Sequence, residues 1–147
     1  MNDFKDAQDI STEHQLTGVW RSDYTYNNSD RGADFQSQHY VRMYPKGGEL
    51  VVESVADANE SYLVARFWLD GDVATGSWQE VTSLKGDYQG TIYHGAAQLI
   101  VDKDRKHLKG KWVGFGKKME VKTGPWEFTY LGEDESALPD GKRAGGQ

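Results

Sequence analysis

The 147-residue chain contains no cysteine and only three prolines. Without cysteine it can form neither a disulfide nor a thiolate metal site, and cysteine nucleophile chemistry is excluded. No apolar run approaches the roughly 18 residues that a membrane-spanning helix needs. The first residues, MNDFKDAQDIST, lack the basic region and following apolar region of a secretory signal. We therefore expect a cytoplasmic protein that does not associate with membranes.

Positive charge is also scarce, because the formal net charge is -6. Nonspecific nucleic-acid binding depends on lysine and arginine contacts to phosphates, so this charge argues against a nucleic-acid partner. The one basic run spans residues 103–118, where Lys109 and Lys111 alternate with Leu108 and Trp112. In a strand this alternation places the lysines on the face opposite the tryptophan. We interpret them as a solvated outer face.

Helical periodicity is almost absent, and short segments that alternate apolar and polar residues fill most of the chain. The length is that of one domain. We expect a polar N-terminal extension over residues 1–15, with a capped helical turn around Ser11 and Thr12, and a barrel domain over residues 16–132. The charged, glycine-rich residues 133–147 are expected to be disordered or loosely ordered.

Eight strands are predicted, at about residues 17–26, 35–44, 50–55, 61–69, 72–82, 88–101, 108–115 and 124–131. Asp70 and Gly71 suit a tight hairpin because both tolerate a positive φ. Every connection is too short for a parallel crossover, so the strands form an antiparallel meander. Such a meander loses its exposed edges by closing on itself. The expected fold is all-β, a single eight-stranded antiparallel up-and-down barrel.

Four of the five tryptophans follow a glycine by two positions. The pairs are Gly18–Trp20, Gly76–Trp78, Gly110–Trp112 and Gly124–Trp126. Residues i and i+2 of a strand share a face, so each pair places a glycine and a large ring on the same side. Inside an eight-stranded barrel the glycine leaves room for the ring of a neighbouring strand. The unequal intervals between the pairs exclude a module repeated at a fixed period.

A G-x-W pair on the first strand of an eight-stranded meander, LTGVW, resembles the calycin superfamily, which includes lipocalins, fatty-acid-binding proteins and avidins. The resemblance covers about Leu16 to Leu131 and implies a barrel that is closed at its base. In many calycins an arginine from a late strand packs across the first tryptophan, but the last strand here, GPWEFTYL, has none. No avidin-like set of biotin contacts is recognisable. The resemblance therefore points to a divergent bacterial-type member.

The alternation of each strand assigns its residues to the two faces of the barrel. The inward set comprises Gly18, Trp20, Ser22, Tyr24 and Tyr26; Ser37, His39, Val41 and Met43; Gly76, Trp78, Glu80 and Thr82; Leu108, Gly110, Trp112 and Gly114; and Trp126, Phe128 and Tyr130. The outward set includes Val19, Arg21, Asp23, Thr25 and Trp68. Tyr93 and His94 are adjacent, so one of them faces inward, and the pattern does not decide which.

The candidate ligand-binding residues are polar and aromatic side chains of the lumen: Tyr24, Tyr26, His39, Trp78, Glu80, His94 and Trp112. Trp20 and Trp126 are assigned instead to the core near the closed base. A buried carboxylate is costly unless it is paired, so Glu80 needs a histidine, a tyrosine or a ligand donor as its partner. A surface position of Glu80 on a strand of the opposite phase stays open. The histidines lack metal-ligand spacing, so neither a metal nor a cofactor is expected.

No nucleophile elbow, phosphate-binding loop or zinc framework occurs in the sequence, and no catalytic residue is assigned. We expect a protein that binds a small, planar or aromatic-compatible molecule at the open end of the barrel, with sensing as one use of that binding. Two alternatives stay open. One is an enzyme of isomerase or decarboxylase type that uses lumenal Glu, His and Tyr, and the other is a ligand-free interaction domain with a filled barrel. Assembly into a homodimer also stays open.

Overall fold

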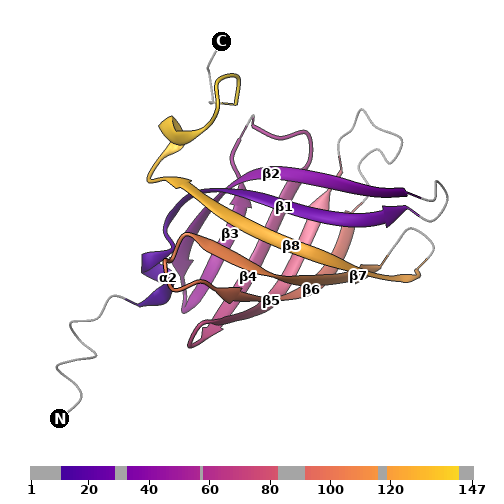
Figure 1. Ribbon diagram of the computed structural model, residues 1–147, viewed down its shortest axis with the longest axis horizontal. Helices are drawn as coiled ribbons and strands as arrows, with labels where there is room; N and C mark the ends of the chain where they lie inside the picture. Colours follow the sequence, from indigo (N-terminus) through magenta and orange to yellow (C-terminus); the bar gives the residue numbers. More distant parts are fainter. Residues whose placement is uncertain (1–10, 29–32, 57, 83–91, 116–118, 143–147) are drawn as a thin grey trace.

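The computed structural model describes residues 11–28, 33–56, 58–82, 92–115 and 119–142. Within them, eight strands form a closed antiparallel barrel in which each strand pairs with its neighbours in sequence order and β8 pairs with β1 (Figure 1). The strands are β1 Gly18–Asn28, β2 Ala33–Lys46, β3 Glu49–Ser54, β4 Tyr62–Asp70, β5 Val73–Val81, β6 Ile92–Val101, β7 His107–Phe115 and β8 Val121–Gly132. The predicted fold class is confirmed. Residues 88–91 of the sixth predicted strand lie outside the described residues.

The hairpin between β4 and β5 forms where the sequence predicts it, with its loop moved by one residue. Asp70 pairs with Val73, so the two loop residues are Gly71 and Asp72. Gly71 has a φ of 62°, as a type II′ turn requires at its first loop position. A positive φ is thus needed at the glycine alone.

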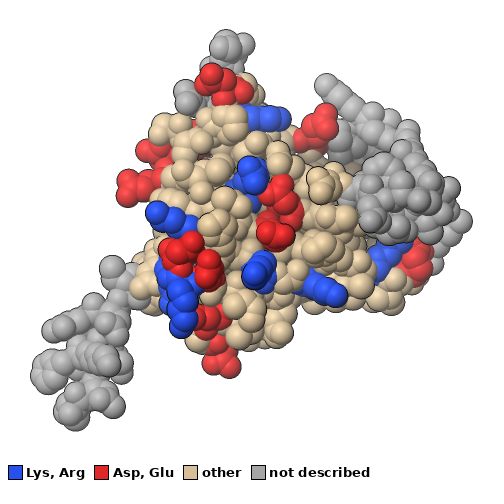
Figure 2. Space-filling model, viewed as in Figure 1, with Lys and Arg blue, Asp and Glu red and all other residues tan. Residues whose placement is uncertain are grey.

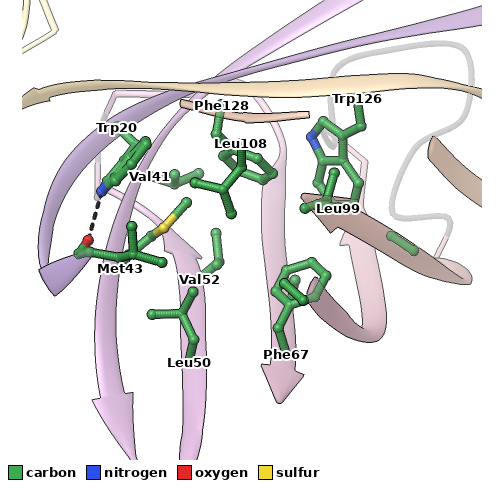
Figure 3. Close-up of a cluster of buried hydrophobic side chains, with 14 of the residues drawn as sticks. Trp20, Val41, Met43, Leu50, Val52, Phe67, Leu99, Leu108, Trp126 and Phe128 are labelled. Atoms are coloured by element: carbon green, nitrogen blue, oxygen red, sulfur yellow. Dashed lines mark hydrogen bonds between the residues drawn. The ribbon is translucent and has the colours of Figure 1, made fainter. Parts of the chain in front are cut away.

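A short helix covers one end of the barrel, which we call the closed end (Figure 1). Helix α2, Thr12–Gln15, is capped by the Ser11 side chain, which accepts a hydrogen bond from the backbone N–H of His14. The following residue, Leu16, is fully buried, and its carbonyl accepts a hydrogen bond of 2.8 Å from Trp20 Nε1 (Figure 3). The capped turn expected near Ser11 is therefore part of the base. Among the described residues, no helix is long and apolar enough to cross a membrane.

Arg105, in the loop between β6 and β7, connects three segments of the closed end. Its Nε donates to Gln15 of α2 at 2.8 Å, and a terminal nitrogen donates to Asp72 of the β4–β5 turn at 2.9 Å. Arg105 also has a φ of 60°, which is uncommon for a residue with a side chain. The two hydrogen bonds link α2 and the turn through one side chain.

The half of the barrel next to α2, at the closed end, is filled with apolar side chains (Figure 3). Its buried members include Leu16, Trp20, Val41, Met43, Leu50, Val52, Phe67, Leu99, Leu108, Trp126 and Phe128. Tyr130 of β8 lies edge-on against Trp20, with ring centroids 5.3 Å apart. A tyrosine therefore contacts the first tryptophan where many calycins are expected to place an arginine. Trp126 satisfies its N–H by donating to Ser22 Oγ at 2.7 Å.

A second, smaller apolar cluster lies on the outside of the barrel. Val19 faces outward on β1 as predicted, yet it is buried in a cluster with Val55, Ala58 and Leu138. Leu138 follows the short 3-10 helix η1, Glu135–Ala137. Leu138 thus attaches the described part of the C-terminal tail to the barrel wall, while most of the other described tail residues are exposed. Residues 1–10 and 143–147 lie outside the described residues.

The basic run of β7 lies on the outer face, as the sequence predicts. Lys109 and Lys111 are exposed, and Lys109 is opposite Glu127 of β8 in the strand register. On the face shown in Figure 2, basic side chains lie among acidic ones, with no separate basic area. This mixture is that of an ordinary solvated surface.

The glycines of the G-x-W pairs allow close approach of backbone as well as of rings. A Cβ built on Gly76 would collide with the carbonyl oxygen of Arg66 and lie 2.8 Å from the Cα of Phe67. At Gly110 it would collide with the carbonyl oxygen of Gln98. The expectation that these two glycines make room for a ring is therefore corrected, because the neighbouring strand itself occupies the space.

We predict that Gly76→Ala lowers the free energy of unfolding by about 1–3 kcal/mol, because β4 must shift away from the new methyl group. Gly110→Ala should act similarly on β6 and β7. The control is Ser77→Ala, an exposed neighbour on β5 whose change meets no backbone. Urea denaturation of the three variants measures the effect. Since alanine at an unstrained site commonly stabilises, an unchanged or raised stability of the glycine variants would contradict this account.

Candidate functional site

An aromatic layer, formed by Trp78, Trp112 and Trp126, borders the packed half of the barrel on the side away from α2. Trp78 of β5 is 5.9 Å from Trp112 of β7 and 6.4 Å from Trp126 of β8, all in edge-to-face arrangements. The indole N–H of Trp78 donates to the carbonyl of Ala96, and that of Trp112 donates to the carbonyl of Thr25, each at 3.1 Å. These hydrogen bonds fix both rings and leave their apolar faces for packing.

Two glycines of neighbouring strands make room for the Trp78 ring. A Cβ on Gly95 of β6 would collide with ring atom Cε2, and one on Gly114 of β7 would lie 2.7 Å from Cζ2. The ring therefore packs against the bare backbone of these two strands. Trp78 shares the inward phase of the buried Ala74 and Gly76, so its side chain lies on the lumenal side of β5.

Glu80 follows Trp78 on the inward face of β5 and accepts two short hydrogen bonds. Tyr24 of β1 donates from its hydroxyl to Oε1 at 2.7 Å, and Ser61 donates from its hydroxyl to Oε2 at 2.7 Å. His39 of β2 places Nε2 3.4 Å from Oε2. The Glu80 side chain is 14% exposed. The lumenal position of Glu80 is confirmed, and its partners come from three other parts of the barrel.

These contacts determine whether Glu80 and Tyr24 are protonated at neutral pH. Burial by itself raises the pKa of Glu80, but the hydrogen bond and electrostatic contact of His39, with hydrogen bonds from Tyr24 and Ser61, more than offset it. The pKa of Glu80 is thus lowered, and the group is ionised at neutral pH. Burial and the adjacent charge of Glu80 strongly raise the pKa of Tyr24, so the phenol keeps the proton that it donates.

His39 is buried beside this carboxylate and stacks on Tyr24, with nearly parallel rings 5.9 Å apart. Its Nε2 lies 2.6 Å from Ser61 Oγ. Because Ser61 gives its single proton to Glu80, Nε2 must carry a proton and donate to Ser61. The other ring nitrogen, Nδ1, is buried and has no hydrogen-bond partner among the described residues.

The arrangement differs from a catalytic triad. In a triad the carboxylate binds the imidazole nitrogen remote from the serine, so that the imidazole can take the serine proton. Here Ser61 and Glu80 both face Nε2 of His39, and the serine proton is directed to the carboxylate. The group therefore holds an ionised carboxylate in a fixed position and does not activate Ser61 as a nucleophile.

Ser61 reaches the site because the loop between β3 and β4 is attached to β2. The Asn59 side chain accepts from the Tyr40 N–H at 2.7 Å and donates to the carbonyls of Tyr40 and Val55. Ser61 is not among the candidate residues that the sequence pattern indicates. The signal was available, since Leu63 is buried on the inner face of β4 and Ser61 lies two positions before it.

The structure brings most of the predicted ligand-binding residues together at the end opposite α2, which we call the open end. Tyr24, His39 and Glu80 are in contact, and the tryptophans of the aromatic layer lie beneath them. Tyr26 is one step closer to the rim of the barrel, 6.2 Å from Tyr24. Trp68, which was assigned to the outer face, is 55% exposed there.

His94, a candidate ligand-binding residue whose direction the sequence left open, does not face the lumen and lies apart from the other candidates. The buried residues Ala97, Leu99 and Val101 fix the odd positions of β6 on the inner face. His94 therefore points outward and is exposed, whereas Tyr93 takes the inward position and is partly buried. Residues several positions away thus determine which of Tyr93 and His94 faces inward, a question that the sequence left open.

One group of described side chains could hold a cation, but it lies away from the lumen. Asp102, Asp104 and His107, in and beside the β6–β7 loop, place one ligand atom each within 4.8 Å of one another. All three are exposed. The Asp104 carboxylate already accepts from the Lys106 N–H and lies 3.0 Å from His107, contacts that lower its pKa. Such contacts are typical of a loop whose side chains accept hydrogen bonds from its own backbone.

The chain matches no protein-family model and no curated protein. The resemblance to the calycin superfamily therefore stays a prediction from the first G-x-W pair and the strand number.

The lowered pKa of Glu80 predicts an acid-dependent loss of stability. A carboxylate whose pKa is lower in the folded chain stabilises fully above its unfolded value of about 4.3, and this contribution is lost as the pH falls through the folded value. In Glu80→Gln, stability should fall less steeply below about pH 4.3, by up to about 1.4 kcal/mol per pH unit. Urea denaturation across acidic pH measures the slopes. The exposed Glu127→Gln is the control, and parallel wild-type and Glu80→Gln curves would contradict the prediction.

Proposed function

We propose that the protein binds a small molecule at the open end of the barrel. The observation that carries the proposal is the contrast between the two ends: the closed end is filled with buried apolar side chains, whereas the Glu80 carboxylate, Tyr24 and Trp78 stay partly exposed above it. An eight-stranded barrel has just enough interior width for side chains or for one small ligand. Apolar walls with a few fixed polar groups are typical of such sites.

The orientation of the rings indicates what shape of ligand fits. The N–H groups of Trp78 and Trp112 are already bonded to backbone carbonyls, so these rings offer apolar faces and edges to a ligand. Hydrogen bonding is concentrated one step nearer the rim, around Glu80 and Tyr24. A planar or aromatic-compatible body with one polar end matches this division.

We also propose that the chain is a divergent, bacterial-type calycin. Three features support this: the closed meander of eight strands, the first-strand tryptophan at the closed end, and the helical turn that covers that end. The contact of Tyr130 with Trp20 is the feature in which it departs from the pattern of many members.

A native mass spectrum of freshly purified protein is the direct test, because a retained compound appears as added mass. Adding that compound back to ligand-free protein should shift the intrinsic fluorescence. We expect Trp78→Phe and Trp112→Phe to diminish this shift and to weaken binding by about 0.5–1.5 kcal/mol each, through lost ring contact. The matched control is Trp68→Phe, which removes an exposed ring of the outer face.

Three other outcomes would each contradict simple binding in the lumen. If the compound bound equally well to the Trp78, Trp112 and Trp68 variants, it would bind outside the lumen. If incubation converted the compound to a product of different mass, the isomerase or decarboxylase alternative would replace simple binding. A protein with no retained mass and no responding compound would fit the ligand-free interaction domain.

A further inference from the structure

We propose that the ligand is an organic cation, a protonated or quaternary amine whose charged end lies beside Glu80 and whose body lies on the rings of Trp78 and Trp112. This inference rests on the proposed function and specifies its ligand class. It follows from the charges that face the lumen, the state of His39 and the geometry of the rings.

Few charged side chains face the lumen. Among the described inward-facing strand positions, apart from His39, two side chains carry a formal charge: Glu80 on β5 and Lys122 near the start of β8. Lys122 is paired with its neighbour Glu120, with 3.6 Å between Nζ and Oε1. Glu80 has no lysine or arginine among the partners that the structure describes, and its donors Tyr24 and Ser61 are neutral hydroxyls.

Among the described residues, His39 is the group close enough to neutralise Glu80. A protonated His39 would carry an N–H on Nδ1, an atom that is buried and has no hydrogen-bond partner among the described residues. A buried, unpaired cationic donor costs much more than a buried, unpaired lone pair. Protonation of His39, whose electrostatic contact lowers the pKa of Glu80, is therefore costly, and a ligand cation beside Glu80 would supply the same stabilisation without it.

The Glu80 carboxylate keeps unused acceptor capacity. Its two oxygens offer about four lone-pair positions, of which the hydrogen bonds from Tyr24 and Ser61 use two and the contact of His39 uses a third. The side chain is 14% exposed. An ammonium group can use the remaining position without displacing either hydroxyl, and it supplies a positive charge beside the carboxylate.

The Trp78 ring packs against Gly95 and Gly114 on the lumenal side of the sheet, two residues from Glu80 on the same strand, and is partly exposed. The face of an indole carries negative electrostatic potential and attracts cations within about 6 Å of its centre. An anion, by contrast, would be repelled by both the rings and Glu80. The lumen therefore favours a cation over a neutral or anionic body of the same shape.

Matched compounds test this inference in the full-length, ligand-free protein. Phenethylamine, 2-phenylethanol and 3-phenylpropionate share a phenyl group and similar length but are cationic, neutral and anionic, and benzyltrimethylammonium is a cation without hydrogen-bond donors. Calorimetry should show both cations binding about tenfold or more tighter than the alcohol, and the propionate binding weakest. In Glu80→Gln the preference for cations should fall to within about threefold of the alcohol.

Two control variants separate charge in the lumen from charge elsewhere. Glu127→Gln removes an exposed carboxylate of the outer face and should retain the preference. Lys122→Gln should retain or increase it, because a basic side chain is removed near the rim. Thermal unfolding confirms that each variant folds, and if Glu80→Gln does not fold, the order of wild-type affinities decides.

The inference is overturned if the alcohol or the propionate binds the wild type as tightly as the amines, if no compound of the set binds, or if a folded Glu80→Gln keeps the preference. The proposed function fails separately. If a neutral or anionic compound binds and Trp78→Phe weakens it, lumenal binding stands and the cationic class is wrong. If neither these compounds nor a mass retained on purification binds in the lumen, both are wrong.

Discussion

Closure of eight strands fixes the width of the barrel interior, and every inward side chain must share that width. Trp78 can enter the lumen because Gly95 and Gly114 present bare backbone beneath its ring. Gly76 and Gly110 contribute differently, since the neighbouring strand approaches so closely that a methyl group would strike its carbonyl oxygen. The large rings and the glycines are thus two consequences of the limited interior width of the barrel. That width decides how much of the lumen is filled by side chains.

The two ends of the barrel use this limited space in opposite ways. At the closed end, α2 and Leu16 complete an apolar core, and Arg105 links the helix to the β4–β5 turn from outside. Toward the open end the apolar side chains give way to a carboxylate and its hydroxyl donors around Glu80. Stability therefore comes mainly from the closed half, where burial is complete, and the open half can hold groups that packing alone does not require.

The sequence predicted what depends on local alternation and failed where distant contacts decide. Strand number, antiparallel order and the inward phase of Trp20, His39 and Glu80 follow from a period of two, and the structure confirms them. The orientation of His94 depends on residues at the other end of its strand. Ser61 was missed although alternation with Leu63 places it inward, because a serine before the strand gives no local sign of the carboxylate that it meets; the Asn59 hydrogen bonds then hold its loop on β2. Burial of Val19 required a tail whose composition suggested no packing.

The polar group around Glu80 is the part of the structure that folding does not explain. A buried charge with its donors stabilises a protein little compared with apolar side chains of similar volume, and replacing such groups by well-packed apolar ones is often neutral or favourable. The core next to the closed end is built from buried apolar side chains and does not include these polar groups. Tyr24, Ser61 and His39 nevertheless converge on one carboxylate and hold it ionised, accessible and fixed in direction. An ordered charge with remaining acceptor positions, set above aromatic faces, is an arrangement suited to recognising a ligand.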